Sequence, residues 1–592
     1  MRISRRISLA LFIAAASPWM ARAAEPEKPS SRDSAVLKKA GDDYWSFLQK
    51  ESFAIRIRLG LPVESFPDFS LKRANADAAF GRELLTRLEK VAETDLTHEE
   101  QLSLWILREE ARELVEEPAD YWLAFPCLPY SSPLRVANPY LAGFKFRESA
   151  DLDRYLQLLG AYGNMLAAME KKLRAQQKRG ILIARDEIPQ VVAVLSASAA
   201  AADQSLLRLK ADRLASFAET DRADVARRVS SAIEKRVRPA AKSLVDYLSG
   251  DYRAQAPEGV GLSQYPGGKD AYAHLVRRST TLSMTAEEIH KLGLSEMDKL
   301  NGLLDLVRQK LDFKGSRDEF LKFLKSDPRF FAKTPDEVGE RLMAAQNRIA
   351  GKVGTLFGRQ PKAPYGVRRL EPELEGSLTF GYYQIPTATD PKGYYLYNGT
   401  SLDKRSLLGA GSLIAHELVP GHHFQLNLQA ENQDLPPWRR EGIFYTAFVE
   451  GWGEYSSAIA GELGMYEDPY DLAGRILFDM FLTSRLVVDT GMNTLGWSRQ
   501  KAMDYLRANT DRSDNEIQTE TLRYSCDMPA QALAYKMGSR KLWELRDRAS
   551  RALGPKFDIR RYHDAILGSG AMPLDILEKH VDWFIAQEKA RK

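Results

Sequence analysis

The chain has 592 residues, with 84 lysines and arginines against 80 aspartates and glutamates, so its net charge is only +4. Hydrophobic residues make up 44% and charged residues 28%, which is the composition of a globular protein and excludes general disorder. No stripe of basic residues mixed with aromatics stands out, so nucleic acid is not an expected partner. The length predicts more than one structural unit.

The first 23 residues have the features of a secretory signal peptide. Arg5 and Arg6 precede an apolar run at 9–16, and Ala21-Arg22-Ala23 is a small-x-small cleavage pattern. The arginine pair also resembles a twin-arginine export signal. No later stretch is apolar enough to span a bilayer. We therefore expect a soluble mature chain without a transmembrane segment, starting near Ala24 and located in the periplasm or secreted.

Helical patterns dominate the chain that follows. Residues 24–35 have the composition of a flexible linker. Beyond them, apolar residues recurring at i, i+3 and i+4 predict amphipathic helices over 79–92, 98–117, 150–178 and 201–248.

A stretch rich in glycine and proline at 255–268 predicts the main domain boundary. It divides an N-terminal helical domain, 36–260, from a catalytic domain, 261–592. Thr285, which is followed by Glu287 and Glu288, is predicted to cap a helix near the start of the second domain.

Two aromatic segments, 377–385 and 393–397, interrupt the helical pattern and predict short strands. Their tyrosines are candidates to line a substrate groove, although strand aromatics more often only pack, so we expect two or three at most to touch substrate. Helices are predicted again over 437–462, 468–489, 498–508, 529–552 and 572–588. The predicted fold class is mostly α, with a small β element.

Three of the eight histidines fall within residues 416–423, directly after the second strand. His416 is followed by Glu417, as in the HExxH zinc motif, where two histidines lie one turn apart on a helix and the glutamate is the general base. Here, however, position i+4 is Pro420, which has no metal-binding side chain and no N–H for a helical hydrogen bond. The motif is therefore a variant of the zinc signature.

Helix geometry shows what the variant requires. On a regular helix, His422 would lie about 240° around the axis from His416, and His423 would lie about 10 Å further along it. Neither could share one ion with His416. A bulge or kink at 419–421 is therefore predicted, and it would bring either His422 or His423 to the metal.

The third ligand is expected from the next helix. Glu450 comes 28 residues after His422, which leaves room for a loop and an antiparallel return. Glu454 lies one turn further on. Spacing allows either carboxylate to bind the metal, with Glu450 favoured and Glu454 suited to orienting a ligating histidine.

Together these motifs resemble a bacterial domain-of-unknown-function family marked by the string HExxPGHH, many of whose members are exported or are lipoproteins. The resemblance rests on 416–423, on Glu-Gly-Trp-Gly-Glu-Tyr at 450–455, on Arg523-Tyr524 and on 529–536, and it covers about residues 40–588. More distantly, the order of parts is similar to that of helical gluzincin peptidases, namely thimet-type oligopeptidases, angiotensin-converting enzyme and thermostable carboxypeptidases. The resemblance implies a large helical body with a deep cleft and a small sheet beside the metal-binding helix.

The resemblance also implies roles for individual residues. It favours His422 over His423 and Glu450 over Glu454 as ligands. Arg523-Tyr524 is similar to a pair whose tyrosine hydrogen-bonds the developing oxyanion. The segment 380–385, which contains Tyr383, corresponds to an edge strand that holds extended peptide, so Tyr383 and Arg523 are candidate substrate-binding residues.

Two positions depart from the pattern. Asn493 stands where relatives often have histidine, and Ala530 stands in place of an expected glycine. Neither change removes a proposed catalytic group.

The sequence thus predicts a zinc peptidase that hydrolyses short peptides, with Zn2+ as its cofactor. Glu417 would be the general base and Tyr524 would stabilise the oxyanion. The alternatives are a zinc hydrolase of another amide or ester, and a non-catalytic periplasmic binding protein with a degenerate zinc site. The sequence leaves open the oligomeric state, the choice between exo- and endopeptidase, and whether Cys127 and Cys526 pair.

Overall fold

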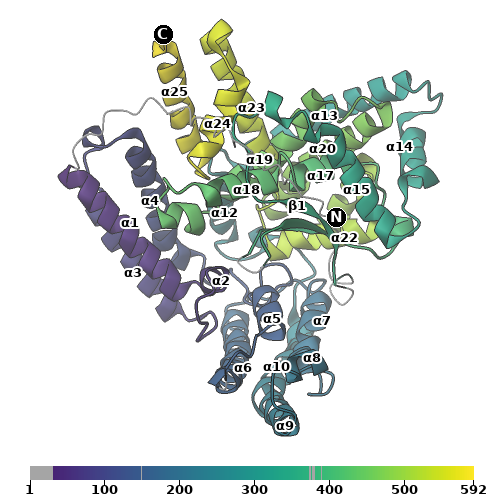
Figure 1. The fold of residues 1–592 in the computed structure, drawn as a ribbon. Coiled ribbons are helices and arrows are strands. Elements are labelled where there is room, and N and C mark those ends of the chain that lie inside the picture. Colours follow the sequence, from purple (N-terminus) through teal and green to yellow (C-terminus); the bar gives the residue numbers. More distant parts are fainter. Residues whose placement is uncertain (1–30, 149, 372–374, 376–380, 388–389) are drawn as a thin grey trace, which may run out of the picture.

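The protein is described by a computed structural model that covers residues 31–592 except 149, 372–374, 376–380 and 388–389. It is a large helical body with one small sheet near its centre (Figure 1). The predicted signal peptide and most of the predicted linker lie outside the described residues.

The N-terminal part consists of α1 (Arg32–Glu51), α2 (Phe53–Arg58), α3 (Leu71–Leu88), α4 (His98–Glu116), α5 (Leu134–Ala142), α6 (Ala150–Gln177), α7 (Ile188–Ala199), α8 (Ala211–Leu214), α9 (Arg222–Ala232), α10 (Arg238–Tyr247) and α11 (Arg253–Gln255). The middle part consists of α12 (Gly268–Thr280), α13 (Ala286–Lys310), α14 (Arg317–Ser326), α15 (Pro335–Ala350), α17 (Ala410–Glu417), α18 (His422–Glu431) and α19 (Thr446–Ile459). The C-terminal part consists of α20 (Pro469–Asn493), α21 (Arg499–Asn509), α22 (Asp514–Leu522), α23 (Leu533–Leu553), α24 (Ile559–Gly568) and α25 (Leu574–Ala590).

Several helix boundaries follow from side-chain caps. The predicted cap at Thr285 is confirmed: its hydroxyl accepts the backbone N–H of Glu288, whose carboxylate accepts the N–H of Thr285 at 2.8 Å. Ser31 caps α1 in the same way by accepting the N–H of Ser34, so the helix begins inside the predicted linker. The linker prediction to residue 35 is therefore too long.

The prediction of continuous helix over 201–248 is wrong in its first part. The chain forms turns before α8, and helix is sustained only from α9. The Ser205 hydroxyl accepts the N–H of Leu207, and the Leu207 side chain is fully buried. Such a local bond offers the backbone an alternative to helix, which a hydrophobic pattern does not reveal.

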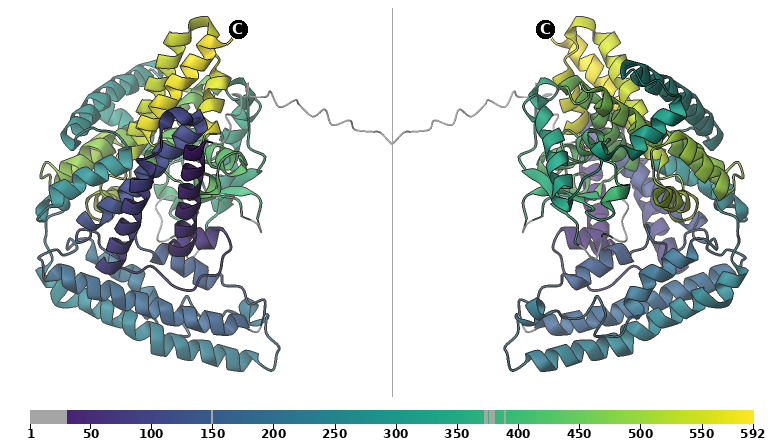
Figure 2. Two further views of the ribbon diagram at one scale, coloured as in Figure 1. Left: turned by 90° about the vertical axis from the view of Figure 1, so that its left-hand side faces the viewer. Right: turned by 90° about the vertical axis from the view of Figure 1, so that its right-hand side faces the viewer.

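Two large cores divide the helices. Helices α5–α10 form a lobe with its own core, in which α6 and α10 lie side by side (Figures 1 and 2). Helices α1, α3 and α4 instead share a core with α19, α23 and α25. The predicted N-terminal domain, 36–260, therefore contributes to both cores.

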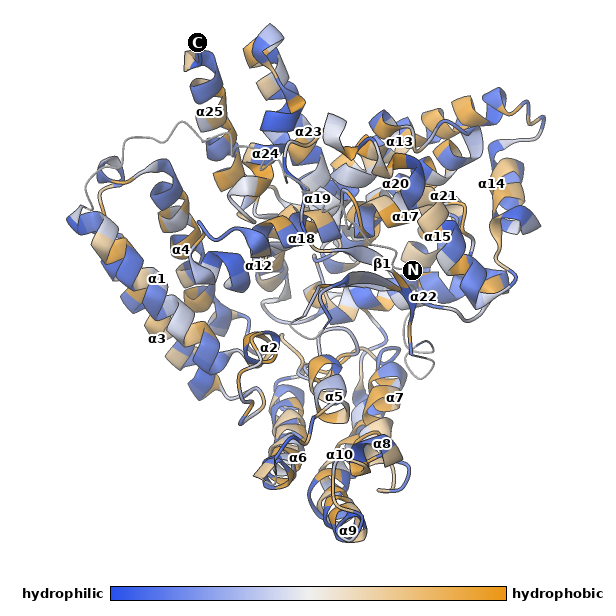
Figure 3. Cartoon of the chain, viewed as in Figure 1, coloured by the Kyte–Doolittle hydropathy of each residue, from blue (hydrophilic) through white to orange (hydrophobic). Residues whose placement is uncertain are grey.

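Most helices are amphipathic, with hydrophilic and hydrophobic residues interleaved along α1 and α3 as well as along α6 and α10 (Figure 3). Among the described helices, none combines the length and the apolarity needed to cross a membrane.

The sheet has three strands, β1 (Tyr365–Arg369), β2 (Tyr382–Gln384) and β3 (Gly393–Tyr397), in the order β1-β3-β2. Strand β3 pairs parallel with β1 and antiparallel with β2. The prediction over 393–397 is confirmed. In the other predicted segment β2 forms, while residues 377–380 lie outside the described part. Strand β2 is an edge strand, as the family resemblance implies.

Candidate metal centre

The histidine-rich segment breaks where the sequence predicts. Helix α17 ends at Glu417 and α18 begins at His422, with a cis Val419–Pro420 peptide between them. The carbonyl of Pro420 accepts hydrogen bonds from the indole of Trp452, at 2.9 Å, and from the hydroxyl of Ser456, at 3.1 Å. Helix α19 therefore holds the break in place.

Gly421 is required by this geometry. A Cβ at this position would lie 1.8 Å from the carbonyl oxygen of His416. Only glycine allows the chain to fold back so tightly that His422 approaches His416. The Pro-Gly step is thus the local cause of the arrangement.

The break brings His416, His422 and Glu450 together. Each histidine places its Nε2 3.3 Å from the same oxygen, Oε2 of Glu450, and the three candidate ligand atoms lie within 4.8 Å of one another. Two ligands held about 2.1 Å from a tetrahedral zinc ion are separated by about 3.4 Å. Among the described residues, this cluster has the donor set and the spacing of a zinc site with three protein ligands, of the kind that leaves a fourth position open.

The electrostatics of the cluster suit a dication. Burial lowers the pKa of His416 to about 4, so its imidazole is neutral, which is the ligand form. Burial opposes ionisation of Glu450, but hydrogen bonds from His416 and His422 outweigh it and hold the pKa of this carboxyl well below its usual value. The Nδ1 atoms of both histidines are buried and have no hydrogen-bond partner among the described residues.

Glu417 stands next to the cluster and is not a member of it. Burial is the main cause that raises the pKa of its carboxyl to about 7, and the charge of Glu450 adds to this effect. The backbone N–H of Tyr383 in β2 donates to the Glu417 carboxylate. A carboxylate with a pKa near neutrality, beside a metal site, is suited to general-base work.

His423 lies outside the cluster. It is fully buried, its Nε2 lies 3.0 Å from the carbonyl of Ala363, and its Nδ1 lies 2.9 Å from the hydroxyl of Tyr383. Burial lowers the pKa of His423 to about 4. Nε2–H therefore donates to Ala363 and Nδ1 accepts from Tyr383, so both ring nitrogens have protein partners. The structure thus selects His422 over His423 for the candidate centre.

Glu454 also lies outside the cluster. Its carboxylate forms a buried ion pair with Arg475 of α20 and makes no hydrogen bond to His416 or His422 among the described contacts. The prediction that Glu454 orients a ligating histidine is therefore wrong. Burial raises the pKa of Glu454 to about 7 despite the nearby guanidinium.

Glycines let α19 approach the cluster closely. A Cβ at Gly453 would lie 2.8 Å from the imidazole of His416, so only a residue without a side chain lets the ring come this close to the helix backbone. A Cβ at Gly451 would lie 2.5 Å from the Cα of Gly538, where α19 and α23 cross. The glycines of the Glu-Gly-Trp-Gly-Glu string are therefore contact points of the site.

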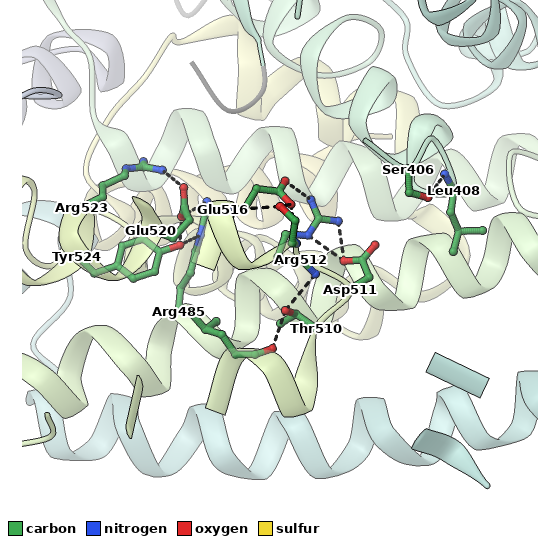
Figure 4. Close-up of polar contacts among 12 residues, drawn as sticks. Ser406, Leu408, Arg485, Thr510, Asp511, Arg512, Glu516, Glu520, Arg523 and Tyr524 are labelled. Carbon is green, nitrogen blue, oxygen red and sulfur yellow. Dashed lines mark hydrogen bonds and ion pairs between the residues drawn. The ribbon is translucent and has the colours of Figure 1, made fainter. Parts of the chain in front are cut away.

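The structure places Tyr524 in a buried polar network with Arg485 and Glu520 (Figure 4). Arg485 donates to the Tyr524 hydroxyl at 2.6 Å, the hydroxyl donates to Glu520, and the ring is fully buried. Arg523 donates to Gln531 at 2.6 Å and faces Glu520 at 3.4 Å. The Tyr524 hydroxyl, which was predicted to bind the oxyanion, is therefore already hydrogen-bonded to Arg485 and Glu520.

Tyr535, to which the sequence analysis gave no role, is a tyrosine that lies beside His416. Its ring stacks on His416 with centroids 6.1 Å apart, and it is partly exposed. Burial and then the charge of Glu450 raise its pKa, and Arg523 hydrogen-bonds it. It stands within the quoted 529–536 segment, but only the crossing of α23 over α19 reveals its position.

Comparison with known proteins agrees with this architecture. Residues 55–581 match the family described as "Bacterial protein of unknown function (DUF885)". The chain therefore belongs to this bacterial family. No curated protein matches the chain.

Two solved structures share the fold. The structure described as "the putative lipoprotein from Colwellia psychrerythraea" superposes with a TM-score of 0.86 at 22% identity, covering 94% of this chain and 100% of that one. A "putative lipoprotein of unknown function from Shewanella oneidensis" superposes with a TM-score of 0.71 at 15% identity, covering 92% of this chain and 99% of that one. These likenesses extend over nearly the whole chain.

Proposed function

We propose that this protein is a zinc-dependent peptidase located outside the cytoplasm. One observation carries the proposal: the two imidazoles and one carboxylate of His416, His422 and Glu450 converge at ligand spacing, with the Glu417 carboxylate beside them. This is the donor set of a catalytic rather than a structural zinc site. The location is supported by the signal-like N-terminus and by the lipoprotein descriptions of the two structural neighbours.

When bound by the three ligands, zinc would polarise the scissile carbonyl and lower the pKa of a water molecule. Glu417 accepts the proton of the attacking water and delivers it to the nitrogen of the leaving amine. The N–H of Tyr383 orients the Glu417 carboxylate. Tyr535, stacked on His416 and linked to Arg523, is placed to donate to the developing oxyanion, a role that we assign to it in place of Tyr524.

A peptide substrate is favoured by the edge strand. Among the described strands, β2 pairs only with β3, and the backbone N–H of Tyr383 interacts with the Glu417 carboxylate. An extended peptide can add to such an edge through its main chain, which would lay a peptide bond beside the base. The Tyr383 hydroxyl is bound to His423 and Asn427, so Tyr383 would act through its backbone.

A zinc hydrolase of another amide or ester would use the same centre, and the edge strand is what favours peptides over these substrates. A non-catalytic metal-binding protein is less favoured, because such a protein has no use for a partly exposed Glu417 beside the ligands.

The test pairs metal content with turnover. Purified protein should hold about one zinc per chain and digest a mixed peptide pool, with activity lost to a chelator and restored by zinc. Glu417→Gln should keep the zinc and lower kcat by about 10²–10⁴, since the general base is removed without a ligand. Glu340→Gln, which changes an exposed glutamate of α15, should change neither.

Full activity of Glu417→Gln would refute the base assignment. Stoichiometric zinc without turnover on any peptide or ester would leave only the metal-binding alternative.

A further inference from the structure

A cavity of about 250 Å³ is lined by α15, α17, α20 and β3, the same part of the fold that carries the candidate centre. This volume has room for an amino-acid side chain together with several waters. Its apolar walls come from α15, from α17, from α20 and from the loops between them, with side chains of Phe331, Val338, Leu342, Leu407, Leu413 and Phe478.

The cavity lies one helical turn from Glu417. Leu413 lines it from α17, four residues before Glu417, which is about 6 Å along the helix. Phe478 lines it from α20, and its ring centroid is 6.1 Å from that of His416. Tyr395 lines it from β3 and pairs in register with Tyr383, whose N–H binds Glu417. The cavity therefore lies within about one helical turn of Glu417 and His416.

Among the described residues, two cations of its wall, Arg405 and Lys325, form no direct ion pair, although Asp511 and Glu516 line the same cavity and their charges act on Lys325 and Arg405 respectively. Arg512 is satisfied by Asp511 at 2.6 Å and by Glu516 at 3.6 Å, as Figure 4 shows. Arg405 is half-buried and donates only its Nε, to the carbonyl of Thr400 at 2.8 Å, while Lys325 is half-buried without a hydrogen bond or ion pair among the described residues. Burial is the main cause that lowers the pKa of both groups.

Half-buried cations that lack a direct ion pair lose part of their hydration, and an anion bound directly to them recovers some of that free energy. The apolar walls and the unpaired cations together fit an apolar residue that carries a carboxylate. The walls would take its side chain, and the guanidinium of Arg405 would pair with the carboxylate.

Building on the proposed peptidase function, we propose that this cavity binds the C-terminal residue of a peptide through its free α-carboxylate and an apolar side chain. The enzyme would then trim short peptides from the carboxyl end. Water adds across the amide: its hydroxyl goes to the carbonyl carbon, its proton passes through Glu417 to the amine, and the C–N bond breaks. No other reactant is needed.

The test compares one peptide sequence in three forms: with a C-terminal leucine as the free acid, with the same leucine amidated, and amidated with glutamate in place of leucine. The free acid should be cleaved at least about tenfold more efficiently than either amide, because a charge-assisted pair is lost in the second form and displaced in the third. Mass spectrometry should show products released from the carboxyl end. Equal cleavage of acid and amide, or preference for the glutamyl amide, would overturn the proposal.

Variants locate the effect. Arg405→Gln should raise KM for the free acid about tenfold while leaving kcat, the zinc content and cleavage of the amide nearly unchanged. Lys325→Gln should act in the same direction. Lys322→Gln, an exposed lysine on the same helix, is the matched control and should change nothing.

Binding without turnover separates this proposal from the proposed function. In Glu417→Gln, calorimetry should show that the free-acid peptide binds at least about tenfold more tightly than its amide and that adding Arg405→Gln removes the difference. If wild-type protein cleaves nothing but this preference is present, the peptidase proposal fails and the carboxylate pocket stands. If acid and amide bind alike with and without Arg405, the pocket assignment fails.

Discussion

At the residue scale, adjacent histidines in the same helix turn do different work. His422 turns its Nε2 to Glu450, whereas His423 is held by Ala363 and Tyr383. We expect His422→Ala to lose bound zinc, because one of three ligands is removed. His423→Ala should keep zinc but lower the free energy of unfolding by about 1–3 kcal/mol, since buried polar partners are left unsatisfied. Metal analysis and urea unfolding measure the two effects, and equal zinc loss in both variants would contradict the assignment.

Tyr524 and Tyr535 provide a second prediction at the residue scale. Tyr535→Phe should lower kcat by about 10²-fold with zinc retained, because a donor to the oxyanion is lost. Tyr524→Phe should leave kcat nearly unchanged and reduce stability, because its hydroxyl serves the buried Arg485–Glu520 pair. Steady-state kinetics of both variants decide the matter. A large loss of kcat confined to Tyr524→Phe would restore the role implied by the family resemblance.

The candidate residues of the centre could be identified from the sequence, but the sequence alone could not decide which of them bind the metal. Clustered histidines and the following glutamates predict a metal site because imidazole and carboxylate groups are ligands that zinc takes in proteins. Whether His422 or His423 turns inward depends on the backbone between Leu418 and Gly421, which no periodicity specifies. Tyr535 could not be singled out either, since its place beside His416 is set by the crossing of two helices distant in sequence.

At the scale of the element, glycines of α19 bring its backbone close to the candidate metal-binding segment. Gly453→Ala would drive a methyl group into the His416 imidazole. We expect weaker zinc binding and a loss of about 1–3 kcal/mol of stability from overpacking, measured by metal titration and denaturant unfolding.

The matched control is Gly302→Ala in the middle of α13, where an added Cβ meets nothing within 4 Å. It should leave zinc binding unchanged and stabilise the protein by up to about 1 kcal/mol through helix propensity. Equal zinc affinity in Gly453→Ala and wild type would show that the close approach is unimportant for the metal.

Element prediction succeeded where local signals are strong. The caps at Thr285 and the aromatic run of β3 are read directly from neighbouring residues. Strand β1 escaped prediction because its sequence, Tyr-Gly-Val-Arg-Arg, lacks apolar alternation and becomes a strand by pairing with β3, more than twenty residues later. Long-range pairing of this kind is invisible in a sequence window.

At the scale of the whole molecule, the N-terminal helices are not a detachable unit. Leu104 and Ile106 of α4 lie in the same core as Trp452 of α19 and Leu577 of α25. Proline- and glycine-rich breaks mark where a chain can turn, whereas a core is defined by which faces meet. The division at residue 260, read from such a break, therefore does not separate the cores.

The same core makes overall stability sensitive to acid through His563. Its Nδ1–H donates to the carbonyl of Leu356 at 2.9 Å and its Nε2 accepts from the hydroxyl of Tyr455 at 2.8 Å. Burial lowers the pKa of His563 to about 3, against about 6.5 for an unfolded histidine. Below pH 6.5 this histidine binds a proton in the unfolded chain but not in the folded protein. The free energy of unfolding therefore falls as the pH falls from 6.5 toward 3.

His563 alone should therefore lower the free energy of unfolding by about 2 kcal/mol at pH 5 relative to pH 7.5, because the change is about 1.4 kcal/mol per pH unit below 6.5. His563→Gln should lower stability at neutral pH but show a shallower decline between pH 6.5 and 4.5, by about one proton, in urea unfolding at a series of pH values. The other buried histidines contribute equally to both proteins and cancel in the comparison. Parallel curves for wild type and His563→Gln would mean that the buried neutral imidazole is not a source of the acid sensitivity.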